Sequence, residues 1–318
     1  MVGAGAFARI DASDWPVVAT EAVGADEKLW VSGLGTRWLF KPVTTTATGH
    51  RQGEDWSEKA AAHLAEHLAV PCAAVELAVR GGVEGSLSRD LGPAGFEVQS
   101  GALFLDALKA PGFVPARDLA ADAARRKCRP GHSLANIRTA LDGVLAPPGS
   151  SLPASFDAYD TFAGYVILDA WIGNRDRHDE NWSVLVPELG NGPVHLCGSY
   201  DQAGGLGFNL RDERRCEMLR LAAGHDVAAF AERGTAWRFE NGPDKPMRTL
   251  VELAVDALEL ASGAARTYWC EAIARLGSVD GATVFERIDS MSDLARSFAG
   301  ALLGINGRRL RDECERRF

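Results

Sequence analysis

The feature that most restricts the fold is an apolar helix that runs directly into a dense polar segment. Residues 173–181 read GNRDRHDEN, and the apolar run WSVLV over 182–186 follows them at once. A buried helix, a polar loop and a buried strand in this order predict a loop that is fixed at both ends by the core. The helix is indicated by apolar side chains at helical spacing, namely Phe156, Tyr159, Phe162, Ala163, Val166, Ile167 and Ala170.

Three polar side chains in and after this loop have a pattern suited to phosphoryl transfer. In kinase-like folds an Asp such as Asp176 accepts the proton of an attacking hydroxyl, and an Asn five residues later, here Asn181, binds Mg²⁺. Asp201 ends a later apolar strand just before a glycine cluster, from where it could reach the same metal. Each residue also has an ordinary explanation as part of a polar loop or a turn.

A lysine and a glutamate in the first third of the chain supply a second pattern. Lys41 closes the apolar strand TRWLFKPV, and Glu58 lies on a helical stripe of alanines. A carboxylate on such a stripe costs free energy unless a cation meets it, so we expect Lys41 to pair with Glu58. Such a pair would hold the lysine against ATP phosphates. The alternative is a surface lysine and a glutamate favoured by the helix dipole.

The periodicity predicts an α+β chain with its strands concentrated in the first third. We expect a hairpin over residues 28–43, a helix over 55–69, and strands in 73–82 and 96–105 that are separated by the glycine-rich stretch 81–95. From about residue 105 the pattern is mostly helical, and the sequence gives no assignment for 205–245. The later helices are predicted over 133–141, 248–262, 265–276 and 292–305.

The composition excludes several classes of protein. The chain of 318 residues has 34 Lys and Arg against 43 Asp and Glu, a net charge of -9, so it is a poor candidate for nonspecific binding to nucleic acid. The basic run 125–129 and the arginines of the C-terminal end are expected to be solvated helix faces. No apolar run is long enough to span a bilayer, and no secretory signal is recognisable. Six widely spaced cysteines, with no CxxC pair, favour reduced thiols and a cytoplasmic protein.

Five sequence blocks together resemble the HipA family of bacterial Ser/Thr kinases. They are WLFKP, GEDWSEKAAAHLAEHLAVP, GHSLANIRTALDG, DAWIGNRDRHDENWSVL and SYDQAGGLGFNL, within residues 28–210. The DRHxxN core is also similar to that of phosphatidylinositol kinases. The resemblance implies a two-lobed protein-kinase-like fold, with a small β-rich lobe over 1–104 that carries one αC-like helix and a larger helical lobe over 105–318. It implies an ATP and Mg²⁺ site between the lobes and transfer of the γ-phosphoryl group to a Ser or Thr hydroxyl of a protein.

The resemblance also implies a role for each matching residue. Lys41 matches the lysine that contacts the nucleotide phosphates, and Glu58 matches its helix partner. Asp176 matches the catalytic aspartate, while Asn181 and Asp201 match the two Mg²⁺ ligands. Some relatives act as toxins on the translation machinery, which implies a protein substrate and an antitoxin-like partner.

Other positions bear on regulation and on the identity of the substrate. His178 matches a histidine of the catalytic loop that is structural. Gly198 and Gln202 stand where many relatives have Pro and His, which affects the acceptor and not the metal ligands. Ser32 is a candidate for autophosphorylation, because some relatives are switched off at a serine in a loop over the nucleotide.

Three alternatives stay open at this level. The acceptor could be a small molecule or an inositol lipid, although the negative charge argues against work at an anionic membrane. A nucleotide-binding module without catalysis would be expected to lack at least one of the matching residues. A metal hydrolase built on His178, Asp179 and His195 lacks a regular ligand spacing.

Overall fold

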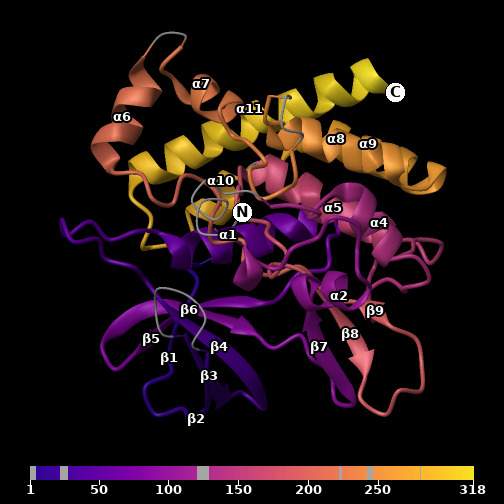
Figure 1. Cartoon of the computed structure of the whole chain (residues 1–318). Helices are drawn as coiled ribbons and strands as arrows, with labels where there is room; N and C mark the ends of the chain where they lie inside the picture. Colours follow the sequence, from indigo (N-terminus) through magenta and orange to yellow (C-terminus); the bar gives the residue numbers. More distant parts are fainter. Residues whose placement is uncertain (1–4, 22–27, 120–128, 222–223, 242–245, 280) are drawn as a thin grey trace.

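The computed structural model describes residues 5–21, 28–119, 129–221, 224–241, 246–279 and 281–318. A six-stranded sheet lies at one end of the molecule and a layer of helices at the other (Figure 1). The strand order is β1-β5-β6-β4-β3-β2, in which only the pair β1 and β5 is parallel. The strands are β1 (Arg9–Asp11), β2 (Val17–Glu21), β3 (Lys28–Gly33), β4 (Thr36–Pro42), β5 (Val75–Arg80) and β6 (Val83–Arg89).

A second, three-stranded sheet and the helices complete the fold. This sheet has the order β7-β8-β9, from Phe96–Ser100, Ser183–Pro187 and His195–Leu196. The predicted α+β class, with strands in the first part and helices in the second, is confirmed; the lobe boundary between 104 and 105 stays a prediction. The principal helices are α1 (Glu54–His67), α2 (Gly101–Ala107), α4 (Leu134–Ala140), α5 (Ala158–Ile172), α6 (Asp212–Arg220), α7 (Val227–Glu232), α8 (Leu250–Leu260), α9 (Gly263–Arg275), α10 (Ala282–Phe285) and α11 (Asp293–Arg317).

The predicted hairpin over residues 28–43 is present as β3 and β4. Its two-residue turn consists of Leu34 and Gly35, with φ of 49° and 76°. Two positive φ values in succession match the right-handed twist of the strands, and glycine adopts one of them without strain. The hairpin therefore carries Lys41 on β4 into the middle of the sheet.

Helix α1 lies between the six-stranded sheet and the helical layer (Figure 1). It packs on β5 and β6, and Glu54 and Asp55 occupy its first turn as the sequence predicted. Its inner face buries small side chains, including Ala61 and Ala65, so the helix approaches the sheet closely. The carboxylate of Glu58 is carried into this contact, where its side chain is fully buried.

Helix α5 is the centre of the helical part, and all fifteen of its residues are buried. Asp157 caps its first turn by accepting from the main-chain N–H of Asp160. Gly173 ends it in the left-handed region, at φ 71°, which a residue with a Cβ adopts only at a cost. The polar loop predicted after this helix thus begins at a fixed point in the core.

Two sequence predictions of secondary structure are wrong in part. Only 96–100 of the predicted strand 96–105 is extended, because Ser100 caps α2 by accepting from the N–H of Leu103. The glycine-rich stretch 81–95 contains β6 after a turn at Gly81 and Gly82, because Ser86 and Ser88 of this strand are buried against neighbouring elements. The segment 205–245, without an assignment from the sequence, includes α6 and α7.

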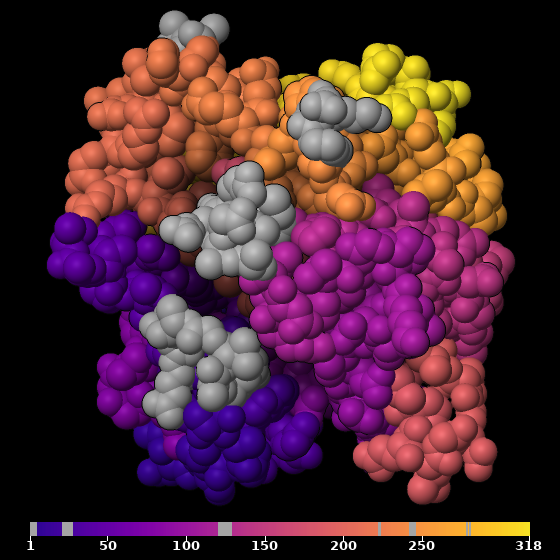
Figure 2. Space-filling model, in the orientation of Figure 1, coloured from indigo at the N-terminus to yellow at the C-terminus, as the bar shows by residue number. Residues whose placement is uncertain are grey.

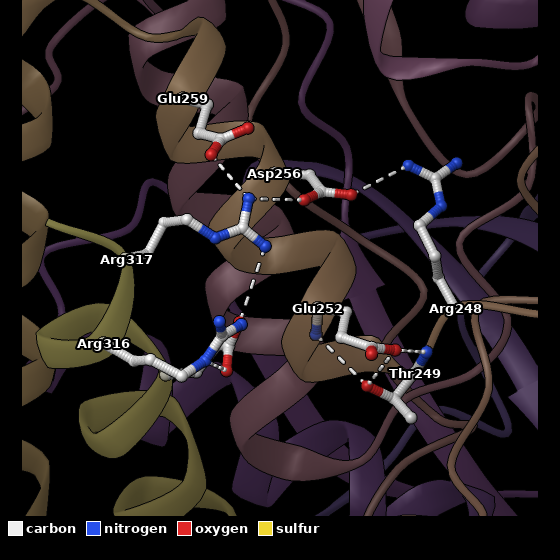
Figure 3. Close-up of polar contacts among 8 residues, drawn as sticks. Arg248, Thr249, Glu252, Asp256, Glu259, Arg316 and Arg317 are labelled. Carbon is white, nitrogen blue, oxygen red and sulfur yellow. Dashed lines mark hydrogen bonds and ion pairs between the residues drawn. The ribbon is translucent and has the colours of Figure 1, made fainter.

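The arginine-rich end of α11 is only partly a solvated face. Arg317 forms ion pairs with Asp256 and Glu259 of α8, and Arg316 pairs with Glu313 one turn earlier on its own helix (Figure 3). The ion pairs of Arg317 connect the C-terminal helix to α8. Residues 125–128 of the other basic run lie outside the described residues. Across the described part of the chain, no helix is both long and apolar enough to cross a membrane.

Candidate active site

A cavity of about 630 Å³ lies between the six-stranded sheet and the polar loop. In Figure 2 a hollow opens between the indigo six-stranded sheet and the magenta and salmon three-stranded sheet. Four of the five predicted site residues line the cavity, namely Lys41, Asp176, Asn181 and Asp201. The fifth, Glu58, does not line the cavity and accepts a hydrogen bond from Nζ of Lys41. Trp30, Leu39, Leu91 and Val98 give the cavity an apolar portion.

Lys41 joins the two parts of the molecule. Its Nζ donates to Glu58 Oε1 on α1 and to Asp201 Oδ1 after β9, each at 2.8 Å. The expected ion pair between Lys41 and Glu58 is therefore present, and Asp201 is a second partner that the sequence did not predict. Ser86 of β6 donates to the other oxygen of Glu58 at 3.1 Å, so both of its oxygens are bound. The lysine is thus fixed in position before any ligand arrives.

The charges of this cluster are strongly coupled. Burial alone would raise the pKa of Asp201, but Lys41 and Lys28 outweigh burial and hold that pKa well below its usual range. Burial would likewise lower the pKa of Lys41, and the two carboxylates raise it instead. Asp201 and Lys41 are therefore both charged at neutral pH. Asp201 thus presents an ionised carboxylate to the cavity, which suits a cation.

The polar loop is held by a buried ion pair that sequence reasoning missed. Arg177 donates from Nε and Nη2 to the two oxygens of Asp169 on α5, at 2.6 and 2.8 Å. Both side chains are buried, and Asn174 donates to the same carboxylate at 2.8 Å. The remaining nitrogen of the Arg177 guanidinium, Nη1, donates to the main-chain oxygen of Asn181 at 2.7 Å. Arg177 thus connects the beginning of the loop to its end.

Main-chain contacts orient the side chains that face the cavity. The side-chain nitrogen Nδ2 of Asn181 donates to the main-chain oxygen of Asp176 at 2.7 Å. The side-chain oxygen of Asn181 therefore points away from this bond. His178 accepts from the N–H of Glu180 at 3.2 Å, and burial, aided by Arg238, lowers its pKa. A neutral His178 with a main-chain partner fits the expected structural role.

The segment after Asp201 passes close to the polar loop. A Cβ on Gly204 would lie 2.7 Å from Asn174 Oδ1 and 3.3 Å from the Cβ of Asp176. Asp201 itself has a positive φ of 59°, which orients its carboxylate toward Lys41. The glycines that the sequence associated with a turn therefore also allow this close approach.

An arginine from the segment between α7 and α8 contacts the predicted catalytic carboxylate. Arg238 donates from Nε to Asp176 Oδ1 at 2.7 Å, and its Nη2 lies 2.5 Å from the same oxygen. The two residues are 62 positions apart, and Arg238 falls in the stretch without a sequence assignment. Nothing in the local pattern could have identified it.

No protein-family model matches the chain, and no curated protein does. Among solved structures, the proinflammatory kinase CtkA of Helicobacter pylori matches with a TM-score of 0.68 and 13% identity, over 98% of this chain and 97% of CtkA. The chain therefore shares the fold of this kinase, which agrees with the kinase-like fold that the sequence motifs predicted. A chain from the HipA, HipB and operator DNA complex of Shewanella oneidensis also matches, with 14% identity over 99% of this chain and 66% of that one. Its TM-score of 0.49 is too low to add to the argument.

Proposed function

We propose that this protein is an ATP- and Mg²⁺-dependent kinase that transfers the γ-phosphoryl group to a Ser or Thr hydroxyl of a protein. The observation that carries the proposal is the joint position of Lys41, Asp176, Asn181 and Asp201 on one cavity, with Lys41 fixed by Glu58. These side chains come from elements far apart in the sequence. A kinase-like fold that had lost catalysis would not be expected to retain this set.

The residues present fit a magnesium nucleotide. Mg²⁺ is commonly held by one or two protein oxygens with phosphate oxygens and waters, and Asp201 and Asn181 offer a carboxylate and an amide oxygen. Among the described residues there is no group of three or more His, Cys, Asp and Glu side chains placed to hold a metal. The apolar side chains Trp30 and Leu39 of the cavity suit the base.

Each residue would have a separate task in phosphoryl transfer. Lys41 would exchange its contact with Asp201 for phosphate oxygens while its Nζ stays bonded to Glu58. Asp201 and Asn181 would hold Mg²⁺, which neutralises charge on the phosphates. Asp176 would orient the acceptor hydroxyl and take its proton on a carboxylate oxygen. The buried pair of Arg177 and Asp169 keeps the loop in the geometry that this transfer needs.

The direct test is incubation of the purified protein with labelled ATP, Mg²⁺ and a cell lysate. We expect labelled proteins with wild type that are missing with Asp176→Asn, since this variant keeps the side-chain volume and loses the carboxylate that accepts the proton. Asp201→Ala should weaken Mg²⁺-dependent nucleotide binding in calorimetry, because it removes a metal ligand. Transfer by Asp176→Asn at the wild-type rate would contradict the assigned role.

The same assay separates the alternatives. Label in small molecules or lipids, with none in protein, would favour a kinase of the same fold with a different acceptor. Nucleotide binding without any transfer would favour a non-catalytic module. An antitoxin-like partner, a toxin role on the translation machinery and a cytoplasmic location stay predictions from the sequence resemblance.

A further inference from the structure

The contact between Arg238 and Asp176 occupies the carboxylate that the proposed function assigns to the acceptor hydroxyl. Nε and Nη2 of Arg238 both contact one oxygen of Asp176, Oδ1. The side chain of Asp176 is 43% exposed and that of Arg238 is 20% exposed, so solvent reaches the pair next to the cavity that Asp176 lines. An arginine held here meets whatever approaches Asp176 from solution.

The main chain of Arg238 is firmly anchored. Its carbonyl oxygen is bonded to Nδ1 of the buried His132 at 2.8 Å, and His132 also accepts from the indole of Trp182, next to the polar loop. The ring of Phe239 stacks on His132, with 4.6 Å between centroids. The guanidinium of Arg238 lies 3.8 Å from the centroid of the Trp237 ring. The position of Arg238 is therefore a built feature of the site and not that of a loose surface side chain.

A second arginine stands next to Asp176 in the sequence. Arg175 donates to the main-chain oxygen and the hydroxyl of Thr235, at 3.3 and 2.7 Å, so it is tied to the segment that carries Arg238. Both arginines line the same small space beside the loop. Within the described ranges no ion pair joins Arg175 to a carboxylate, and its side chain is exposed. A protein of net charge -9 thus places two guanidinium groups around one small space beside the loop, and one of them, Arg238, contacts the predicted base.

We propose that Arg238, with Arg175, forms an anion subsite that selects acceptors with acidic side chains close to the reacting Ser or Thr. This inference rests on the proposed function and names its class of substrate. A partly exposed ion pair is worth little net free energy, so an acidic acceptor can replace Asp176 as the partner of Arg238. The exchange leaves Asp176 available to the hydroxyl when such an acceptor is bound. Arginine is suited to this task because its planar group binds carboxylates with two hydrogen bonds.

The test uses a degenerate Ser/Thr peptide library with the full-length protein, ATP and Mg²⁺. Selected sequences are then compared as pairs in which each Glu or Asp is replaced by Gln or Asn. We expect kcat/KM to be about tenfold higher for the acidic member of a pair, as one charge-assisted contact provides. In Arg238→Gln the preference should fall to about twofold or less, with neutral peptides phosphorylated at least as well as by wild type.

Two controls make the outcomes distinct. Arg214→Gln removes an exposed arginine of α6, whose partner is Glu217, and should keep the full acidic preference. Calorimetry with Mg²⁺ and ATP checks that Arg238→Gln still folds and binds nucleotide. Equal loss on acidic and neutral peptides would show that Arg238 only orients Asp176, and would overturn the inference. Transfer by wild type without acidic selection would overturn it too but leave the proposed function intact, whereas no transfer at all would overturn both.

Discussion

Removal of the carboxylate of Asp169 should cost the protein a large part of its stability. Asp169 and Arg177 are 3% and 2% exposed, so neither can exchange its partner for water. In Asp169→Asn, Arg177 keeps its bond to the main-chain oxygen of Asn181 and its contact with the Tyr165 ring, but no carboxylate faces it. Breaking a buried pair on one side costs about 3–5 kcal/mol, since a charge is left without compensation.

Replacement of both partners should cost much less than the sum of the two single changes. Asp169→Leu with Arg177→Met removes both charges and fills a similar volume, and such exchanges are often neutral or stabilising. We therefore expect a coupling energy of at least about 3 kcal/mol in a double-mutant cycle on the free energy of unfolding. Urea denaturation followed by circular dichroism measures all four proteins.

The double variant should be stable and yet inactive in phosphoryl transfer. Methionine cannot donate to the main-chain oxygen of Asn181, so the end of the loop loses the contact that Arg177 provides. A matched control is the exposed pair of Arg214 and Glu217 on α6, for which we expect a coupling of about 0.5 kcal/mol or less. Additive losses at Asp169 and Arg177, or a double variant with wild-type transfer, would refute this reasoning.

Three further predictions concern the surroundings of the loop. Burial lowers the pKa of His132 to about 4 from 6.5, so the unfolded chain binds more protons between these values. The free energy of unfolding should therefore fall by about 3 kcal/mol as pH drops through this window, and His132→Asn should flatten the slope in denaturation at several pH values. Gly204→Ala places a Cβ 2.7 Å from a loop amide oxygen and should cost about 1–3 kcal/mol in urea denaturation, whereas Gly300→Ala, with open space around it, should gain about 0.5–1 kcal/mol. Intact-mass spectra test the candidate Ser32: a phosphate there that is missing from Asp176→Asn would support self-regulation, whereas an unmodified wild type after long incubation with ATP would exclude it.

The sequence predicted those parts of the site that obey a local rule. Helical periodicity placed Glu58 among alanines, so a cationic partner could be predicted for its carboxylate. Nζ of Lys41 is this partner, at 2.8 Å from Glu58 Oε1. The polar loop between an apolar helix and an apolar strand could be located because both flanks had to be buried. Asp176, Asn181 and Asp201 line one cavity as their order suggested. Their roles in catalysis stay predictions.

The remainder depends on contacts that no local pattern contains. Strand β6 resembles a glycine-rich loop in sequence, but Gly85 is small because a Cβ there would lie 2.2 Å from the main-chain oxygen of Lys41. Gly101 is likewise small because its Cβ would meet the ring of Trp182 at 2.1 Å. Arg238 reaches Asp176 across 62 residues. Glycine and arginine are ordinary in loops, so only the folded neighbours reveal why they stand at these positions.

Both carboxylates of the predicted chemistry are held by cations from other elements, Asp201 by Lys41 and Asp176 by Arg238. If the ligands carry matching charges, each of these groups changes its ionic partner and is not left with water alone. A magnesium nucleotide offers Asp201 a metal and Lys41 a phosphate, while an acidic acceptor offers Arg238 a carboxylate. Binding would then exchange one set of ion pairs for another, so its net free energy would depend on small differences between them. If both proposals hold, the protein would discriminate its substrates by charge at both ends of the reaction, because a neutral ligand at either end would leave one of these cations bound to the carboxylate that the proposed chemistry requires.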